Sequence, residues 1–133
     1  PEATISQSFE VKDFKTGAVR MAAEAGVPVV PMITFGGQRL WTKGRKREMT
    51  RGTLVALTVG EPISVTTQDD PVEATAHLRS VMQDLYDQTI EAYEPKPAPG
   101  AWWWPARYGG AAPTLQEMRE QEARDRAARE TGD

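Results

Sequence analysis

The chain has 133 residues, of which 39% are hydrophobic, and 16 Lys and Arg against 19 Asp and Glu give a net charge of −3. This length suits one small domain, since domains usually run to about 100–200 residues. The absence of Cys excludes disulfides, thiolate metal sites and thiol nucleophiles, and a single His cannot build a multi-histidine site. We therefore expect neither a metal nor a cofactor. No apolar run reaches the ~18 residues that a membrane-spanning helix needs.

Composition divides the chain near residue 93. Every Val, Ile and Phe precedes position 94, and five of the ten prolines lie between Pro95 and Pro113. A segment with so few large aliphatic side chains cannot offset the entropy of ordering it. We therefore expect a folded part at 1–93, a Pro/Gly/Trp-rich linker at 94–113 and a tail at 114–133.

The folded part begins with a helix and a strand. Residues 18–25 are rich in helix formers, and Gly26 follows where a helix C-terminus favours glycine. Residues 27–33 form a short apolar run that predicts a buried strand. Its two prolines place the strand at a sheet edge, or outside the hydrogen-bonding ladder at those points.

A second strand and a long helix follow. Residues 53–59 predict another buried strand. Asp70 and Pro71 form a helix N-terminus, and the helix should run to about Tyr93 with Leu78 and Leu85 on its apolar stripe. The order helix, strand, strand, helix indicates an α/β fold, and two strands are too few for a sheet covered on both faces. We therefore expect part of a three-layer α/β domain.

The tail carries two further features. Residues 102–104 are three consecutive Trp, which a segment without a core of its own cannot bury. We expect them to dock on the body of the protein, with a bilayer interface or a partner as alternatives. Thr114 and Glu117 form a capping box that should start a charged, solvated helix reaching about Glu130. We expect the linker to be extended.

Three blocks near the start resemble one family. Residues 1–6, Pro-Glu-Ala-Thr-Ile-Ser, resemble the Phe-Pro-Glu-Gly-Thr-Arg-Ser block of the glycerolipid (lysophosphatidic acid) acyltransferases. Residues 14–18 resemble the Phe-Lys-x-Gly-Ala element that follows it, and residues 27–32 are similar to the family's Val-Pro-apolar-apolar-Pro block. The blocks occur in order with the family's spacing, and the resemblance extends to about residue 63. It implies that 1–93 is the C-terminal part of an acyltransferase domain.

The resemblance implies transfer of a fatty acyl group from acyl-CoA or acyl carrier protein (acyl-ACP) to a glycerol-phosphate or lysophospholipid hydroxyl, as in phospholipid biosynthesis. The family's general base is the His of a His-x-x-x-x-Asp motif that precedes the first block. Here the single histidine is His77, and Met82 stands five residues later. We expect His77 to be an ordinary surface or packing residue.

The first residue, Pro1, stands within the first block and is not Met. The resemblance therefore implies that the catalytic His and Asp lie upstream of Pro1, in a missing N-terminal half that would be a partner of this one. We expect this fragment alone to contain no catalytic residue and to be inactive.

The first block departs from the family pattern at two positions. Ala3 replaces Gly, and Ile5 replaces the Arg that in the family helps to hold the acceptor phosphate. Because Ile cannot supply a guanidinium contact, another cation must do so or the acceptor differs. Lys15, and after it Lys12, are the candidate cations. Glu2 and Thr4 match the block, and the resemblance implies that they bind the acceptor.

A basic segment lies between the two expected strands. Six cations and one acid give residues 39–51 a local charge of +5, namely Arg39, Lys43, Arg45, Lys46, Arg47, Glu48 and Arg51. Such a cluster beside Trp41 can meet an anionic membrane surface, coenzyme A phosphates or a carrier protein, or it can be a solvated loop. We expect a peripheral protein on the cytoplasmic side of a membrane. A net acidic chain without a nucleic-acid motif does not predict nucleic-acid binding.

These residues support a second hypothesis of another class. The basic segment and the three Trp can form a non-catalytic module that contacts a membrane surface or another protein. The sequence does not determine the acyl chain, the donor or the exact acceptor, nor does it explain why the chain begins at Pro1.

Overall fold

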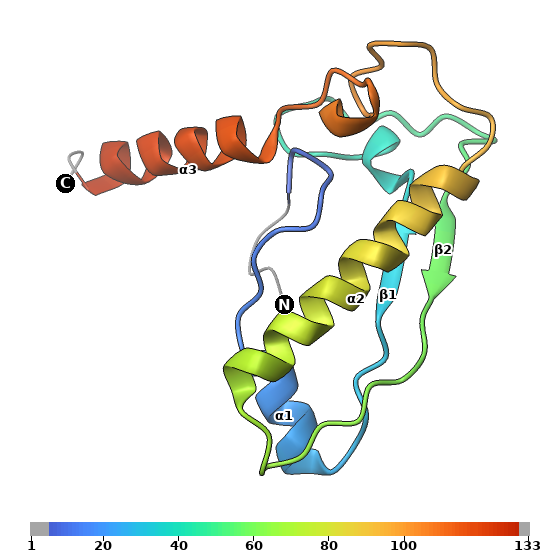
Figure 1. Ribbon diagram of the computed structural model, residues 1–133. Helices are drawn as coiled ribbons and strands as arrows, with labels where there is room; N and C mark the ends of the chain where they lie inside the picture. Colours follow the sequence, from blue (N-terminus) through green and yellow to red (C-terminus); the bar gives the residue numbers. More distant parts are fainter. Residues whose placement is uncertain (1–5, 131–133) are drawn as a thin grey trace.

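The computed structural model describes residues 6–130, which form three helices and a two-stranded sheet (Figure 1). In chain order the elements are α1 (Gly17–Ala25), β1 (Met32–Phe35), the 3-10 turn η1 (Gly37–Arg39), β2 (Ala56–Val59), α2 (Pro71–Ala92), the 3-10 turn η2 (Ala106–Tyr108) and α3 (Leu115–Glu130). Among these residues, no helix is both long and apolar enough to cross a bilayer. The arrangement confirms a partial α/β domain.

The long helix α2 starts and packs as its sequence predicts. The Asp70 side chain accepts hydrogen bonds from the amides of Val72 and Glu73, at 2.8 and 2.9 Å. These bonds satisfy two of the amides that a helix N-terminus leaves free. Leu78 and Leu85 are buried on one stripe of the helix. Packing of that stripe places α2 diagonally across the sheet (Figure 1).

The strands are shorter than the apolar runs that predicted them. β1 pairs antiparallel with β2, with Met32 opposite Val59 and Phe35 opposite Ala56. Before Pro31 the pairing continues only as an isolated bridge between Val29 and Ile63. Proline has no amide hydrogen, which explains why the prolines delay the regular ladder.

The expectation of two fully buried strands is wrong for this chain. Along β1, Ile33 and Phe35 point inward and are buried. The side chains of the opposite face are exposed: Met32 by 50%, Leu57 by 61% and Val59 by 56%. The physical reason is that α2 covers one face of the sheet, and nothing within residues 6–130 covers the other.

Two hydrophobic clusters hold the fold together. The larger cluster joins β1, α2 and residues 94–113, which we call the Trp-rich segment. Its buried members are Val11, Ile33, Phe35, Leu85, Tyr86, Ile90, Tyr93 and Trp104. The smaller cluster joins α1 to the start of α2 through Val19, Ala22, Val65 and Leu78. Burial of each large side chain contributes ~1.5–3 kcal/mol, so the larger cluster dominates stability.

The Trp-rich segment folds back onto the body and is not extended. The Trp104 ring lies edge-on to Phe35, with the ring centroids 5.5 Å apart, and is only 5% exposed. Trp103 packs against the same Phe35 and against Tyr93. A Cβ at Gly110 would collide with the Trp104 backbone, so the chain can return past this indole only at a glycine. Docking of Trp103 and Trp104 on the body is thereby confirmed.

The charged helix α3 projects from the body, and its first turns meet the N-terminal segment (Figure 1). The predicted capping box is present, since Glu117 accepts hydrogen bonds from the Thr114 amide and hydroxyl. Met118 is 3% exposed, and its sulfur accepts a hydrogen bond from the Gln7 amide. Lys12 and Glu122 form an ion pair at 2.8 Å. α3 is therefore anchored at one end.

Candidate functional site

Of the first block only Ser6 is described, because residues 1–5 lie outside the described part of the chain. Two predicted acceptor residues, Glu2 and Thr4, belong to this block, so their roles remain predictions. The same holds for a catalytic His and Asp upstream of Pro1, because the structure describes the chain only from Ser6 onward.

The two candidate cations are placed by the structure. Lys15 has an exposed side chain and lines neither of the cavities described below. Lys12, the second candidate, is engaged with Glu122, and its side chain is 12% exposed. A role for Lys15 in binding the acceptor therefore remains a prediction.

A cavity of about 270 Å³ opens beside Ser6, the last residue of the first block; we call it the Ser6 cavity. Most of its walls are apolar, and they come from the N-terminal segment, β1, the basic segment and α2: Phe9, Val11, Ile33, Phe35, Trp41 and Tyr86. Its polar groups are Ser6, Glu10, Thr34, Gln38 and Thr42. Apolar walls with a few polar groups are typical of sites for small or amphiphilic ligands.

Glu10 is the one carboxylate among the described residues that line the Ser6 cavity, and its side chain is 12% exposed. Burial raises the pKa of Glu10 above its ordinary value of 4.5, although Arg107, 3.8 Å away, opposes the increase. The nearby Asp87 carboxylate adds to the increase. Glu10 therefore holds a proton more readily than a solvated glutamate does.

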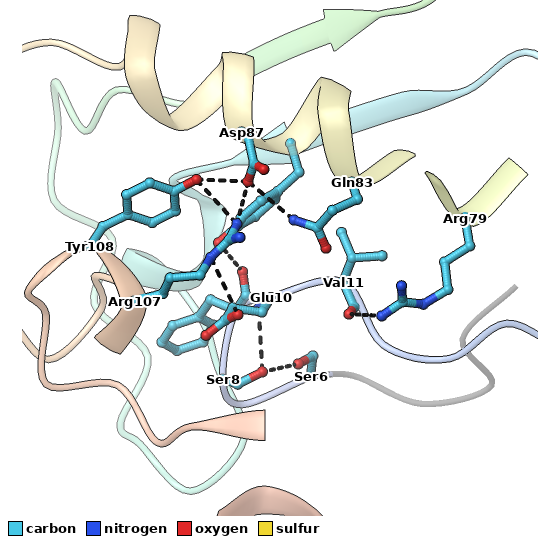
Figure 2. Close-up of polar contacts among 11 residues, drawn as sticks. Ser6, Ser8, Glu10, Val11, Arg79, Gln83, Asp87, Arg107 and Tyr108 are labelled. Carbon is cyan, nitrogen blue, oxygen red and sulfur yellow. Dashed lines mark hydrogen bonds and ion pairs between the residues drawn. The ribbon is translucent and has the colours of Figure 1, made fainter. Parts of the chain in front are cut away.

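Behind Glu10, a polar network joins α2 to the Trp-rich segment (Figure 2). Asp87 accepts hydrogen bonds from Arg107, from the Tyr108 hydroxyl at 2.7 Å and from Gln83 at 3.1 Å. Burial and the bond to Asp87 raise the pKa of Tyr108 to about 12. The hydroxyl therefore stays protonated and remains a donor at neutral pH.

The N-terminal segment is also held to α2 through its backbone. The Tyr86 hydroxyl donates to the Phe9 carbonyl at 2.7 Å, and burial raises the pKa of that hydroxyl. Arg79 donates to the carbonyls of Lys12 and Val11, at 3.1 and 3.4 Å. Because three carbonyls of this short segment have fixed donors, the chain that follows the first block has a defined path along α2 (Figure 2).

A second cavity of about 220 Å³ lies between the basic segment and the Trp-rich segment; we call it the Arg45 cavity. Three cations and one acid line it, namely Arg39, Arg45, Lys46 and Glu48. Gln38, Trp41 and Thr42 line both cavities, so the two adjoin along these side chains. We call this pair of neighbouring cavities the groove; one of them is mainly apolar, and the other is cationic.

Thr42 lines both cavities. Thr42 is 7% exposed, and its Oγ1 has no hydrogen-bond partner within the described part of the chain. A buried polar atom without a partner costs free energy, which a bound hydrogen-bonding group would offset. The hydroxyl is therefore a candidate donor to a bound group.

The described residues offer binding groups and no catalytic dyad. His77 is exposed on α2 and lines neither cavity, as expected of an ordinary surface histidine. Across residues 6–130, no three His, Asp or Glu side chains are placed to hold a metal. On this chain the groove can hold and orient an amphiphile.

The sequence does not predict the contacts that support the groove through residues distant along the chain. Asp87, Arg107 and Tyr108 meet across 20 positions of chain, and the sequence gives no signal of their contact beyond a Gln83–Asp87 pair at helical spacing. The charge of the basic segment is evident from the sequence, but its neighbours are not. Those neighbours depend on where the Trp-rich segment folds.

Comparison with known proteins gives the class. The family described as Acyltransferase matches residues 1–34, which end within β1. In this part the chain therefore resembles the acyltransferases.

Two plant relatives extend this match. The 1-acyl-sn-glycerol-3-phosphate acyltransferases of Limnanthes douglasii and Limnanthes alba are each 30% identical to this chain over 92 residues. The alignments cover 69% of this chain and 31% of each relative, so the chain spans about a third of their length. No solved structure matches the chain.

Proposed function

We propose that the chain is the acceptor-binding part of a longer enzyme that transfers a fatty acyl group to a glycerol-phosphate or lysophospholipid hydroxyl. The observation that carries the proposal is the groove beside Ser6, which joins the family-matched block to an apolar chamber with a cationic end. A lysophospholipid has the same two parts, an acyl chain and a phosphate. The activity in the names of the two plant relatives supports the same acceptor class.

The donor in this proposal is acyl-CoA or acyl-ACP, and the reaction belongs to phospholipid biosynthesis. General-base catalysis contributes ~10²–10⁴-fold to such transfers. The His and Asp of the family motif would come from a segment preceding Pro1. The bare sheet face around Leu57 and Val59 supports such a segment, because it offers apolar area for further structure to cover. The chain alone would then lack acyl transfer.

Acyl transfer by the complete gene product to lysophosphatidate tests the proposal. We expect Glu2→Ala and Lys15→Ala each to lower the rate, because both residues match the acceptor-binding blocks. Glu61→Ala is the matched control, since Glu61 is exposed and lies outside both cavities. Unchanged rates in both site variants would remove these residues from the acceptor site. Absence of any transfer by the complete protein would refute the enzyme function.

A peripheral membrane contact is a second candidate function, favoured by the exposed part of the basic segment. Trp41 is 62% exposed and Met49 76% exposed, and both lie among cations. The Arg47 guanidinium lies 5.0 Å from the centroid of the Trp41 ring. Basic residues near an anionic bilayer contribute ~1 kcal/mol each. Trp103 and Trp104 are committed to the core, so of the three consecutive Trp only Trp102 is left for this surface.

Vesicle sedimentation separates the membrane contact from catalysis. We expect phosphatidylglycerol vesicles to bind the chain and phosphatidylcholine vesicles not to, with binding lost as salt screens the charges. Trp41→Ala should weaken binding, while Trp102→Ala should have the smaller effect because its ring is half-buried. No sedimentation with either vesicle at low salt would refute a membrane contact on the cytoplasmic side.

A further inference from the structure

Two of the three cations of the Arg45 cavity lie against aromatic rings. The Arg45 guanidinium lies 3.9 Å from the centroid of the Trp102 ring, and the Arg39 guanidinium lies 4.4 Å from that of Trp103. Stacking fixes a guanidinium plane without using its N–H donors, which remain available in the plane. Arg39 uses one of its donors in a bond to the Tyr93 hydroxyl at 3.4 Å. Within residues 6–130, neither arginine forms an ion pair with a carboxylate. The Trp rings therefore fix the positions of the two guanidinium groups, and no carboxylate of the described residues neutralises their charge.

The loop that carries these cations is tied down from several sides. The Gln38 side-chain amide donates to the Trp103 carbonyl at 3.2 Å, and the Gln7 side-chain amide donates to the Lys43 carbonyl at 2.9 Å. Within the loop, the Glu48 amide donates to the Leu40 carbonyl at 3.0 Å. These bonds link the cationic end of the groove to both the Trp-rich segment and the N-terminal segment. A ligand would meet a formed site, which lowers the entropic cost of binding.

The donors suit a phosphoryl group. A guanidinium fork can donate to two oxygens of a phosphate, an ammonium supplies a point charge, and a hydroxyl can donate to a third oxygen. Arg45, Lys46 and the unpartnered Thr42 hydroxyl provide these three kinds of donor around one cavity. Glu48 leaves an excess of positive charge there, because it is one acid against three cations.

We propose that the Arg45 cavity is the phosphoryl subsite of the groove, with Arg45, Lys46 and Thr42 binding the phosphate and Trp102 positioning Arg45. Its cations take the place of the arginine that is missing at position 5. The apolar part of the same molecule meets the Ser6 cavity, which adjoins at Gln38, Trp41 and Thr42. The inference rests on the proposed function only for the identity of the acceptor.

Equilibrium binding to the full chain tests the subsite without any acyl transfer. Trp41 and Trp102 line the cavity, so intrinsic fluorescence reports binding. The probes are glycerol 3-phosphate, with glycerol as the phosphate-free control, and lysophosphatidate below its critical micelle concentration, with monoacylglycerol as its control. We expect both phosphates to bind and to exceed their controls. Equal affinity of each phosphate and its control would overturn the subsite.

Arg45→Gln and Arg51→Gln form a matched pair. Losing hydrogen bonds from a charged donor should weaken phosphate binding roughly ten- to hundredfold in Arg45→Gln. Arg51 is exposed and lines neither cavity, so Arg51→Gln should stay within about twofold, the effect of screened surface charge. Equal losses in the two variants would show that overall charge alone attracts the phosphate, and would overturn the proposal.

Thr42→Val separates binding from folding. Valine matches the shape of threonine and removes the buried hydroxyl that lacks a partner, so thermal stability should be kept or raised. Phosphate affinity should nevertheless fall several-fold, and Thr42→Ser should restore it. Unchanged affinity in Thr42→Val would remove this hydroxyl from the site. A purely structural role would instead lower the melting temperature.

Two further measurements distinguish the possible sources of the phosphate. Equal binding of phosphatidylglycerol vesicles by Arg45→Gln and by the unchanged chain would show that Arg45 does not contact the membrane, and would support a soluble phosphate as the ligand of the subsite. Conversely, weaker vesicle binding in Arg45→Gln would place a lipid phosphate in the same cavity. If the complete protein transfers no acyl group but glycerol 3-phosphate binding depends on Arg45, the proposed function fails and the subsite stands.

Discussion

The Trp-rich segment and α3 are successive parts of one apolar-poor tail, yet the structure uses them differently. The Trp-rich segment places Trp104 in the main core, beside Phe35 and Tyr93. α3 contributes one buried side chain among those described, Met118, and otherwise meets the body through charged pairs. An aromatic side chain buries ~150–250 Å², so two indoles can fix a segment that its average composition marks as a linker. The number of apolar residues matters less than the area each one buries.

Among the substitutions that test this difference, the loss of Trp104 should lower the free energy of unfolding most. Trp104→Ala removes a buried indole that contacts Phe35, Tyr93 and Trp103, and we expect it to lower the free energy of unfolding by ~3–5 kcal/mol. Urea denaturation followed by circular dichroism measures the change. Trp102→Ala is the control, because that ring is half-buried and should cost less. If both cost the same small amount, the segment is a linker after all.

Loss of Met118, which anchors α3 to the body, should have the next largest effect on stability. Met118→Ala removes the one buried side chain among the described residues of the helix, and we expect a loss of ~2 kcal/mol, at the lower end of the range for core Met substitutions. Arg119→Ala removes an exposed pair with Asp13 at 2.7 Å and should cost under ~1 kcal/mol. Hydrogen exchange of the α3 amides would show whether the helix frays first. A larger loss in Arg119→Ala than in Met118→Ala would mean that charge, not packing, holds the helix.

Local sequence signals account for the elements of the body. Gly26, Asp70 and the Thr114 capping box mark helix ends through hydrogen bonds within a few residues, and these predictions are confirmed. The strands were harder to predict. An apolar run such as 53–59 shows which side chains prefer burial, but not whether a second layer is present to cover Leu57. Burial on the second face of a sheet depends on partners that the run itself does not encode.

The candidate site was less predictable for the same reason. The three blocks and the basic segment are visible as motifs, and the resemblance to acyltransferases follows from the three blocks. The groove was not visible, because Arg45 meets Trp102 only after the tail folds back. Likewise, the side chain that faces Glu10 is Arg107, in the Trp-rich segment and far along the chain. Contacts at this separation depend on the folded path and leave no periodic signal.

Arg107 should have a smaller effect than the two anchors, because its side chain is 43% exposed. It donates a hydrogen bond to Asp87 and faces Glu10, and so joins the Trp-rich segment to the body through charge. We expect Arg107→Gln to cost ~1–2 kcal/mol, because a hydrogen bond to a charged group contributes ~1.5–3 kcal/mol and partial exposure lowers that value. Gln83→Ala is the matched control, since it removes a neutral donor from the same Asp87. If Arg107→Gln lowers the free energy of unfolding no more than Gln83→Ala does, the charge of Arg107 does not contribute to stability.

The smallest effect should be a change in the slope of stability against pH. Because burial raises the pKa of Glu10, the folded state binds the proton more tightly than the unfolded state does. The resulting stabilisation is present below the ordinary pKa of 4.5 and is lost as pH rises through the folded value. Glu10→Gln should remove this decline. Asp69→Asn should show the opposite change, because hydrogen bonds from Thr66 lower the pKa of Asp69 and make stability fall toward acid.

Urea denaturation between about pH 3 and pH 7, a range that spans the ordinary carboxyl pKa values, measures both slopes. Arg107 and Asp87 face Glu10, so the Glu10 slope should steepen in Arg107→Gln, where the opposing positive charge is gone. The pH series in Arg107→Gln therefore tests whether the Trp-rich segment also acts on the groove electrostatically. If the slope is unchanged in both Glu10→Gln and Arg107→Gln, Glu10 is solvated and the Ser6 cavity is wetter than its apolar walls imply. A steeper slope in Arg107→Gln than in the unchanged chain would show that the Trp-rich segment affects the protonation of Glu10.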